Sequence, residues 1–308
     1  MTTKVGIMDY SYLRNNKAIN SSGMKKLLIL CAILSTVGMS SCTSQNEPDN
    51  SETNIDGLLV GRFSVREDKQ VQFSQGNLQY QASTKIWRFA ENQYDFVGND
   101  NANISNDYSG WIDLFAWGTG RNPTLSSTER TDYVVYDEWG NNAISNGGNR
   151  TKWWKTLDMF EWKYLFYYRP NADELFGLGS VNGVNGTIIL PDDWVKPEGV
   201  TFNPSRKKGL ADDEENKDII YNSNEDNYTH NTYTAAQWKL MESAGAVFLP
   251  AAGCRYGIYM DFVGTGGSYW SMTAGGDYKS YYFSYNIFGL STQSYYDRCI
   301  GRSVRLVR

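Results

Sequence analysis

Two stretches of this chain carry the start signal of an α-helix, and they limit how the remaining residues can fold. DMFEWKYLF begins with Asp158 and has Glu161 three positions later. TAAQWKLM begins with Thr234 and has Gln237 at the same spacing. This is the capping-box pattern, in which the first side chain bonds the third amide of the helix and the third side chain bonds back. Each stretch then places a Trp on one face with an apolar residue three positions later, so we predict two short helices with buried tryptophans.

Outside these helices the chain favours short strands and long loops. Between residues 61 and 81 two alternating stretches flank the polar turn 67–69, which predicts a β-hairpin. The segment 87–120 is rich in Gly, Asn and Trp, which indicates long loops packed by aromatic rings. In the closing GRSVRLVR, residues 303–307 alternate with the period of a half-buried strand. We therefore predict an α+β fold: two helices packed on small antiparallel sheets, with long aromatic- and Gly-rich loops.

A targeting signal lies near the amino terminus, in MKKLLILCAILSTVGMSSC. It starts at Met24 with two lysines, continues as an apolar run from Leu27 to Val37, and ends in small residues followed by Cys42. These features define a secretory signal, and the apolar run is too short for a stable transmembrane helix. The final cysteine resembles that of a bacterial lipoprotein signal, in which Cys42 is acylated and becomes the first mature residue. The alternative is a secreted protein in which Cys42 is an ordinary residue.

These signals give the domain organisation and the expected location. Residues 1–41 are an upstream extension plus the signal peptide, and we expect the true start at Met24. Residues 42–56 are polar and acidic, which is typical of a flexible tether. Residues 57–308 form the folded domain. We expect a lipid-anchored protein on the outer membrane that faces the cell exterior, because acyl chains hold such a chain on a membrane.

Charge and composition exclude several classes of function. The net charge of −5 leaves no basic surface for nucleic acid, so we expect no nucleic-acid partner. His230 is the single histidine, and we interpret it as a solvated loop residue. We therefore predict no catalytic residue, no metal ligand and no cofactor. The acidic run 212–218 indicates a solvated loop; a calcium site there is the alternative, although its spacing fits no EF-hand.

Four motifs together resemble a known bacterial family. DMFEWKYLF, ESAGAVFLPAAGCRYG, GSYWSMT and GRSVRLVR follow the order found in Bacteroidetes surface lipoproteins of the Fibrobacter major paralogous type. The resemblance covers most of residues 57–308 and is most specific over 243–308. It implies the C-type-lectin-like fold of the formylglycine-generating enzymes. Met272 and Cys254 stand where the family usually has other residues.

The chemistry of residues 254–300 favours a binding role. The segment contains nine tyrosines, with Ser, Gly and Asn among them. Antibody paratopes are rich in the same residue types, because Tyr gives a large amphipathic contact at low entropic cost. The alternative is that these tyrosines are ordinary core residues on a sheet, since alternating aromatic residues also suit strand packing. The residues that we predict to contact a protein or glycan ligand are Tyr256, Ile258, Tyr259, Phe262, Tyr278, Ser280, Tyr281, Tyr285, Phe288, Tyr295, Tyr296, Asp297, Cys299 and Ile300.

The resemblance also raises a genetic hypothesis. Some proteins of this fold are the variable proteins of diversity-generating retroelements, which rewrite adenines, typically in AAY codons. Changes at the first two bases of AAY never produce Trp, Met, Lys, Glu or Gln. In residues 254–300 these five types occur only five times, at Met260, Trp270, Met272, Lys279 and Gln293. We therefore expect 254–300 to be a diversified surface and GRSVRLVR to be the fixed strand that anchors it. A neighbouring reverse-transcriptase gene would test this.

Two other classes of function remain open. The first is a structural or fimbrial surface component. The second is an enzyme similar to the formylglycine generators, which use two neighbouring cysteines; in the folded part of this chain Cys254 and Cys299 are far apart in sequence. The binding hypothesis makes further claims: the predicted contact residues are exposed, the two cysteines are dispensable, and Trp270 and Val304 belong to the core.

Overall fold

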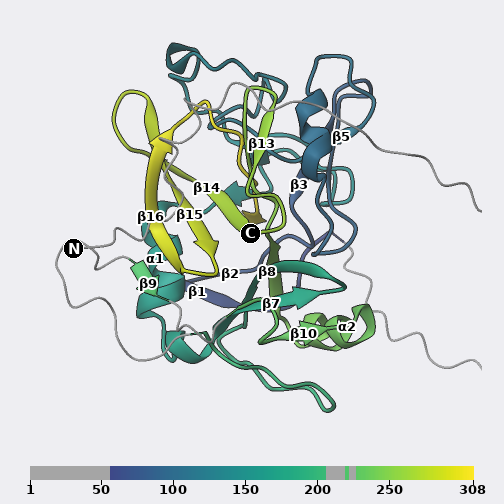
Figure 1. Cartoon of the computed structure of the whole chain (residues 1–308), viewed down its shortest axis with the longest axis vertical. Helices are drawn as coiled ribbons and strands as arrows, with labels where there is room; N and C mark the ends of the chain where they lie inside the picture. The colour runs from purple at the N-terminus through teal and green to yellow at the C-terminus, as the bar shows by residue number, and fades with distance from the viewer. Residues whose placement is uncertain (1–55, 206–218, 222–226) are drawn as a thin grey trace, which may run out of the picture. The chain divides into compact units, whose positions relative to one another are not determined.

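The computed structural model describes residues 56–205, 219–221 and 227–308, and it shows a mixed α+β fold in which strands predominate (Figure 1). Residues 54–308 form one compact unit. Cys42, the signal peptide and almost all of the tether lie outside the described residues, as does the acidic run 212–218. None of the described helices is long and apolar enough to cross a membrane.

The described strands form six small sheets. Three sheets have two strands each: β1 (Phe63–Arg66) with β2 (Lys69–Val71), β12 (Cys254–Tyr256) with β13 (Tyr259–Asp261), and β17 (Leu306–Val307) with β6 (Lys155–Thr156). One sheet has three strands, in the spatial order β4 (Ile86–Phe89), β3 (Leu78–Gln81) and β5 (Trp111–Ile112). Two sheets have four strands: β10 (Thr232–Tyr233), β7 (Phe176–Val181), β8 (Val184–Ile189) and β11 (Val247–Pro250) in one, and β14 (Gly266–Ala274), β15 (Lys279–Asn286), β16 (Gly289–Asp297) and β9 (Ile219–Tyr221) in the other. Strands β10 and β7 pair in parallel, and the other pairs are antiparallel. The predicted hairpin is confirmed as β1–β2.

Both predicted helices are present, and each starts with a complete capping box. Helix α1 (Met159–Lys163) follows Asp158, and α2 (Ala235–Ser243) follows Thr234. Both tryptophans, Trp162 and Trp238, are buried. After α1 the chain continues as one π-helical turn, η5 (Tyr164–Tyr168), where the sequence predicted further α-helix. The described 3₁₀ helices are η2 (Gly98–Asn103), η3 (Arg130–Asp132), η4 (Trp139–Asn141) and η6 (Ala172–Glu174).

The described residues contain three buried clusters. The first lies where α1 covers β15, and Trp162 stacks on Phe283 with ring centroids 5.0 Å apart. The second is built around tryptophans and contains Trp270 and Val304, as predicted. The third joins α2 to β11 through Trp238 and Phe248. Aromatic rings thus fill the space between sheets that are individually too small to form a core.

The carboxyl-terminal segment is buried throughout, which corrects the predicted half-buried strand. Residues 303–307 are all buried, and only Leu306–Val307 form a strand. Backbone bonds of 2.9 Å run from the amide of Leu78 to the carbonyl of Val304 and from the amide of Gln72 to the carbonyl of Arg308. Arg305, which the alternation placed outside, donates a 2.9 Å bond to the amide oxygen of Gln93. The segment therefore passes through the core instead of covering it.

Candidate functional site

The predicted contact residues occupy three separate places. The first is the end of the β14–β15–β16 sheet, where Tyr278 and Tyr295 are 40% and 41% exposed. Tyr281 pairs with Tyr295 across β15 and β16, and their ring centroids lie 5.0 Å apart. The Lys279 ammonium lies 5.1 Å from the ring of Tyr295. We call these four residues the tyrosine cluster.

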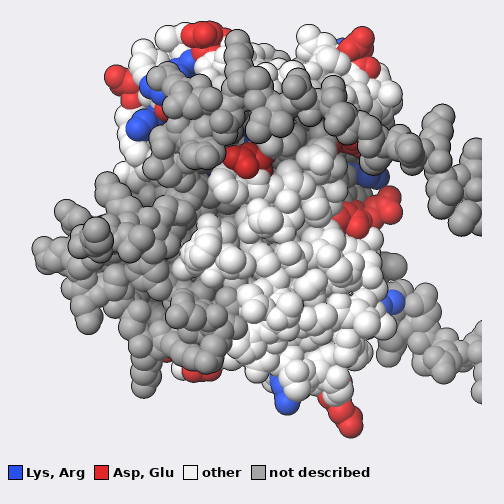
Figure 2. All heavy atoms as spheres, viewed as in Figure 1, with Lys and Arg blue, Asp and Glu red and all other residues white. Residues whose placement is uncertain are grey.

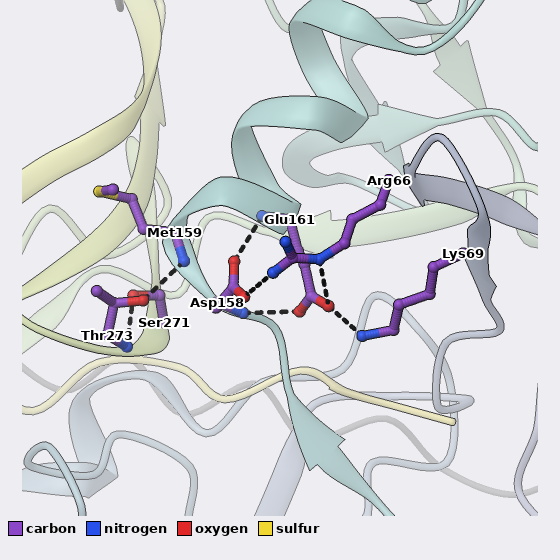
Figure 3. Close-up of polar contacts among 7 residues, drawn as sticks. All are labelled: Arg66, Lys69, Asp158, Met159, Glu161, Ser271 and Thr273. Carbon is purple, nitrogen blue, oxygen red and sulfur yellow. Dashed lines mark hydrogen bonds and ion pairs between the residues drawn. The ribbon is translucent and has the colours of Figure 1, made fainter.

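Hydrogen bonds from three elements hold the tyrosine cluster in place. Figure 3 shows the amino terminus of α1 bonded to β14: the amide of Met159 donates to the hydroxyl of Thr273 at 3.0 Å. Ser271, on the same strand, donates its hydroxyl to the carbonyl of Tyr281 at 2.9 Å. The hydroxyl of Tyr295 donates to the carbonyl of Gly275, and a Cβ at Gly275 would collide with the Tyr295 ring. The cluster is therefore a surface supported by strands and a helix rather than by a free loop.

Charged residues reinforce the same end of α1. Asp158 accepts from the amide of Glu161 and also pairs with Arg66 from β1, as Figure 3 shows. Glu161 is buried and pairs with Lys69 from β2. These contacts fix the helix terminus that supports Thr273, and they explain why a helix of only one turn is well positioned.

The second place is the hairpin β12–β13. Ile258 and Tyr259 at its turn are 62% and 68% exposed, while Tyr256 and Phe262 are half-buried. Gly253, just before β12, has φ +75°, a conformation that side chains with a Cβ rarely adopt. The two most exposed apolar residues of the hairpin, Ile258 and Tyr259, therefore lie together at its turn.

A loop that the sequence did not single out joins these two places. Arg130 forms a 2.8 Å ion pair with Asp297 at the end of β16, and the carbonyl of Tyr133 accepts a 3.1 Å bond from Arg298. A Cβ at Gly257 in the hairpin would lie 3.2 Å from the methyl group of Thr128. Residues 128–133 therefore connect the hairpin to the tyrosine cluster. The adjoining Val134 and Val135 are exposed apolar residues that extend this surface; no sequence pattern marked them.

Five predicted contact residues are buried, so for them the expected exposure was wrong. They are Ser280, Tyr285, Asp297, Cys299 and Ile300. Tyr285 belongs to the core under α1 and donates its hydroxyl to the carbonyl of Leu249. The hydroxyl of Ser280 accepts from Arg298, and Arg130 pairs with Asp297. Tyr296 is half-buried against the second cluster.

Phe288 occupies the third place, apart from the others. It is exposed, but it lies in the β15–β16 turn, at the opposite end of the sheet from Tyr278 (Figure 1). Eight residues of β15 separate the two positions, roughly 26 Å at about 3.3 Å per residue. The expected single surface of all fourteen residues is therefore divided.

On the face seen in Figure 2, the middle of the described surface is largely uncharged, with most Lys, Arg, Asp and Glu side chains towards its edges. Among the described residues no group of three or more His, Cys, Asp or Glu is arranged to hold a metal ion. His230 lies exposed in a turn. The middle of the visible face thus offers mainly uncharged residues for contact.

Cys254 and Cys299 are both buried thiols, and neither belongs to a disulfide. Burial raises the pKa of the Cys299 thiol to about 11, with Asp297 adding to this rise. The thiol is therefore protonated at neutral pH, whereas thiol chemistry needs the thiolate.

Replacing the two cysteines should lower the stability of the domain only because the side chains are buried, since there is no disulfide to lose. Because both side chains are buried, we now expect more than the small effect predicted from the sequence: Cys→Ser at each position should lower the free energy of unfolding by about 1–3 kcal/mol, since a hydroxyl is buried in place of the thiol. Cys→Ala at the same positions should cost less. The measurement is urea denaturation with and without a reductant. A wild-type protein that reductant destabilises would contradict this, because it would indicate a disulfide.

Comparison with known proteins identifies no relative: no protein-family model matches the chain, and no curated protein or solved structure is significantly similar.

Proposed function

We propose that this chain is a lipid-anchored surface receptor or adhesin of the C-type-lectin-like fold, and that it binds a protein ligand through the tyrosine cluster and the hairpin β12–β13. The observation that carries the proposal is the exposure of Tyr295 and Tyr259 on hydrogen-bonded strands, and of Tyr278 and Ile258 in the turns that adjoin these strands. Large aromatic side chains that are exposed yet held rigidly lose little entropy on binding. Acylation of Cys42 would attach this domain to the membrane.

Three features support this function over the alternatives. The exposed side chains of the tyrosine cluster and of the hairpin adjoin one another, because the loop 128–133 joins the hairpin to the sheet. Exposed apolar side chains that adjoin one another are typical of interaction sites. The buried, protonated Cys299 disfavours a formylglycine-type enzyme, and a structural stalk gives no reason for a rigid aromatic cluster.

The burial pattern also narrows the diversification hypothesis. We propose that diversified positions are those with accessible side chains, such as Ile258, Tyr259 and Tyr295, because changes there leave the core intact. At Cys254, Cys299 and Ile300, by contrast, every change of size would disturb packing.

The tyrosine cluster should lose binding without losing stability. We expect Tyr278→Ala, Tyr281→Ala and Tyr295→Ala each to change the free energy of unfolding by about 1 kcal/mol or less. At least one should weaken ligand binding by about 2 kcal/mol or more, as truncation of an aromatic anchor does. The matched control is Tyr168→Ala, which removes a tyrosine that is 61% exposed elsewhere on the domain.

Site-specific photocrosslinking in cells that display the full chain measures binding before the ligand is known. A photoreactive phenylalanine analogue at position 295 should give a discrete protein adduct, which Tyr281→Ala should reduce, and the same analogue at position 168 should give none. Identical adducts from both positions, or none from position 295, would overturn the proposed site.

A further inference from the structure

A cleft of about 570 Å³ lies on the β4–β3–β5 sheet and contains none of the residues predicted from the sequence. In this sheet Gln79 pairs with Arg88, and Trp111 pairs with Gln81, so Gln79, Arg88 and Trp111 share one face. The opposite face carries Tyr80 and joins the second core cluster. The volume falls in the range of roughly 300–1,000 Å³ that is typical of small-molecule sites.

Arg88 forms a fixed platform in this cleft. Its guanidinium carbon lies 3.8 Å from the centroid of the Trp111 ring. Its Nε donates to the amide oxygen of Gln79 at 2.9 Å, and its Nη1 lies 3.3 Å from a carboxylate oxygen of Glu91. Gln79 is 4% exposed, and the Arg88 bond holds its amide oxygen, so its amide NH₂ is the group of this side chain that can donate to a ligand or water in the cleft.

The walls of the cleft are anchored before any ligand arrives. Tyr108 packs against the second core cluster, and Tyr94 packs against the third. Beneath the wall that carries Val97 and Asp100, the buried carboxylate of Asp113 accepts 2.8 Å bonds from the amide of Val97 and the side chain of Asn101. Binding of a ligand would therefore lose little conformational entropy in ordering this site.

The charges of the lining disfavour an anion and restrict where a cation could bind. One cation, Arg88, stands against three carboxylates, Glu91, Asp95 and Asp100, which gives a net charge of −2 and disfavours an anion. The Arg88 guanidinium covers the ring of Trp111, so it would repel a second cation from that ring.

A neutral polyhydroxyl ligand matches what remains. Each hydroxyl both donates and accepts, so its site needs donors and acceptors together. The cleft has donors in Arg88 and Gln79 and acceptors in Asp95 and Asp100, with the ring of Tyr108 as an apolar surface for C–H groups. We propose that this cleft binds a neutral saccharide. The inference does not depend on the tyrosine cluster.

The test is a glycan array probed with the full chain, followed by calorimetric titration of the best-bound soluble glycan. The array contains neutral, acidic and amino-sugar glycans. The strongest signals should come from neutral glycans. Tyr108→Ala and Asp100→Ala should each weaken the titrated affinity at least about tenfold, which corresponds to about 1.4 kcal/mol. Asp100 is exposed, so its replacement reports on binding even if Tyr108→Ala fails to fold. Tyr168→Ala should leave the affinity unchanged.

Three outcomes would overturn the inference. They are the absence of binding to any neutral glycan on the array, a preference for acidic or amino-sugar glycans, and unchanged affinity in the Asp100→Ala protein. If the photocrosslink at position 295 is absent but saccharide binding is intact, the proposed function is contradicted and the saccharide inference for this cleft is not.

Discussion

Replacing Trp270 by alanine should lower the free energy of unfolding by about 3–5 kcal/mol, as large-to-small changes of buried aromatic residues do. Trp270 is 1% exposed, and its indole NH donates a 2.8 Å bond to the carbonyl of Phe115. Its ring lies 5.8 Å from that of Tyr282 and 4.9 Å from the guanidinium of Arg302. The variant loses all of these contacts and leaves a cavity. Because domains are typically stable by about 5–15 kcal/mol, this loss removes a large part of the total.

Urea denaturation followed by circular dichroism measures this loss, and two variants calibrate it. Trp270→Phe keeps an aromatic ring but removes the indole donor, so it should cost less, about 1–2 kcal/mol. Tyr168→Ala, at the surface, should cost about 0.5 kcal/mol or less. If Trp270→Ala costs no more than Tyr168→Ala, Trp270 does not belong to the core.

Asp113 should make the stability of the domain depend on pH. Burial raises the pKa of this carboxyl from 3.8 to about 6. The hydrogen bonds from Asn101 and Val97 lower the pKa, but their effect is smaller than that of burial. The folded state thus binds the proton more tightly than the unfolded chain. The resulting stabilisation is fully present below about pH 3.8 and is lost as the pH rises through 6, a total of about 3 kcal/mol.

Comparison with Asp113→Asn isolates this group from the other titrating residues. The difference in unfolding free energy between wild type and Asp113→Asn should be largest below about pH 3.8 and should have fallen by about 3 kcal/mol once the pH is well above 6. Urea denaturation at intermediate pH values measures it. Asp107→Asn, which removes an exposed carboxylate, controls for the change in net charge. A wild-type minus Asp113→Asn difference that stays constant with pH would contradict the assignment.

The local structure of the helix starts and of the first hairpin could be predicted because their causes are local. Asp158 and Glu161 satisfy one another within one turn, whatever the rest of the chain does. The buried course of the carboxyl terminus could not be predicted. Arg305 is stabilised by Gln93, which is 212 positions away, and an alternating pattern carries no information about such a partner.

The candidate site could likewise be predicted only in part. Tyr281 and Tyr285 lie on one face of β15, as their spacing predicted, yet Tyr285 is buried and Tyr281 is half-buried. The difference arises because Tyr285 belongs with Phe283 to the core cluster in which Trp162 stacks, whereas the ring of Tyr281 packs on that of the exposed Tyr295. Strand periodicity indicates which side chains share a face, but it does not indicate how far a neighbouring helix extends over that face.

The buried path of the carboxyl-terminal segment has a consequence for how the domain folds. Val304 bonds to Leu78 and Arg308 to Gln72, so these backbone contacts join residues more than 220 positions apart. Such contacts form only after long loops have been ordered, which slows folding. Until residues 304–308 pair, the apolar sides of the earlier sheets lack their partner. Partly folded forms of the domain should therefore expose apolar surface and be prone to aggregate until this segment is in place.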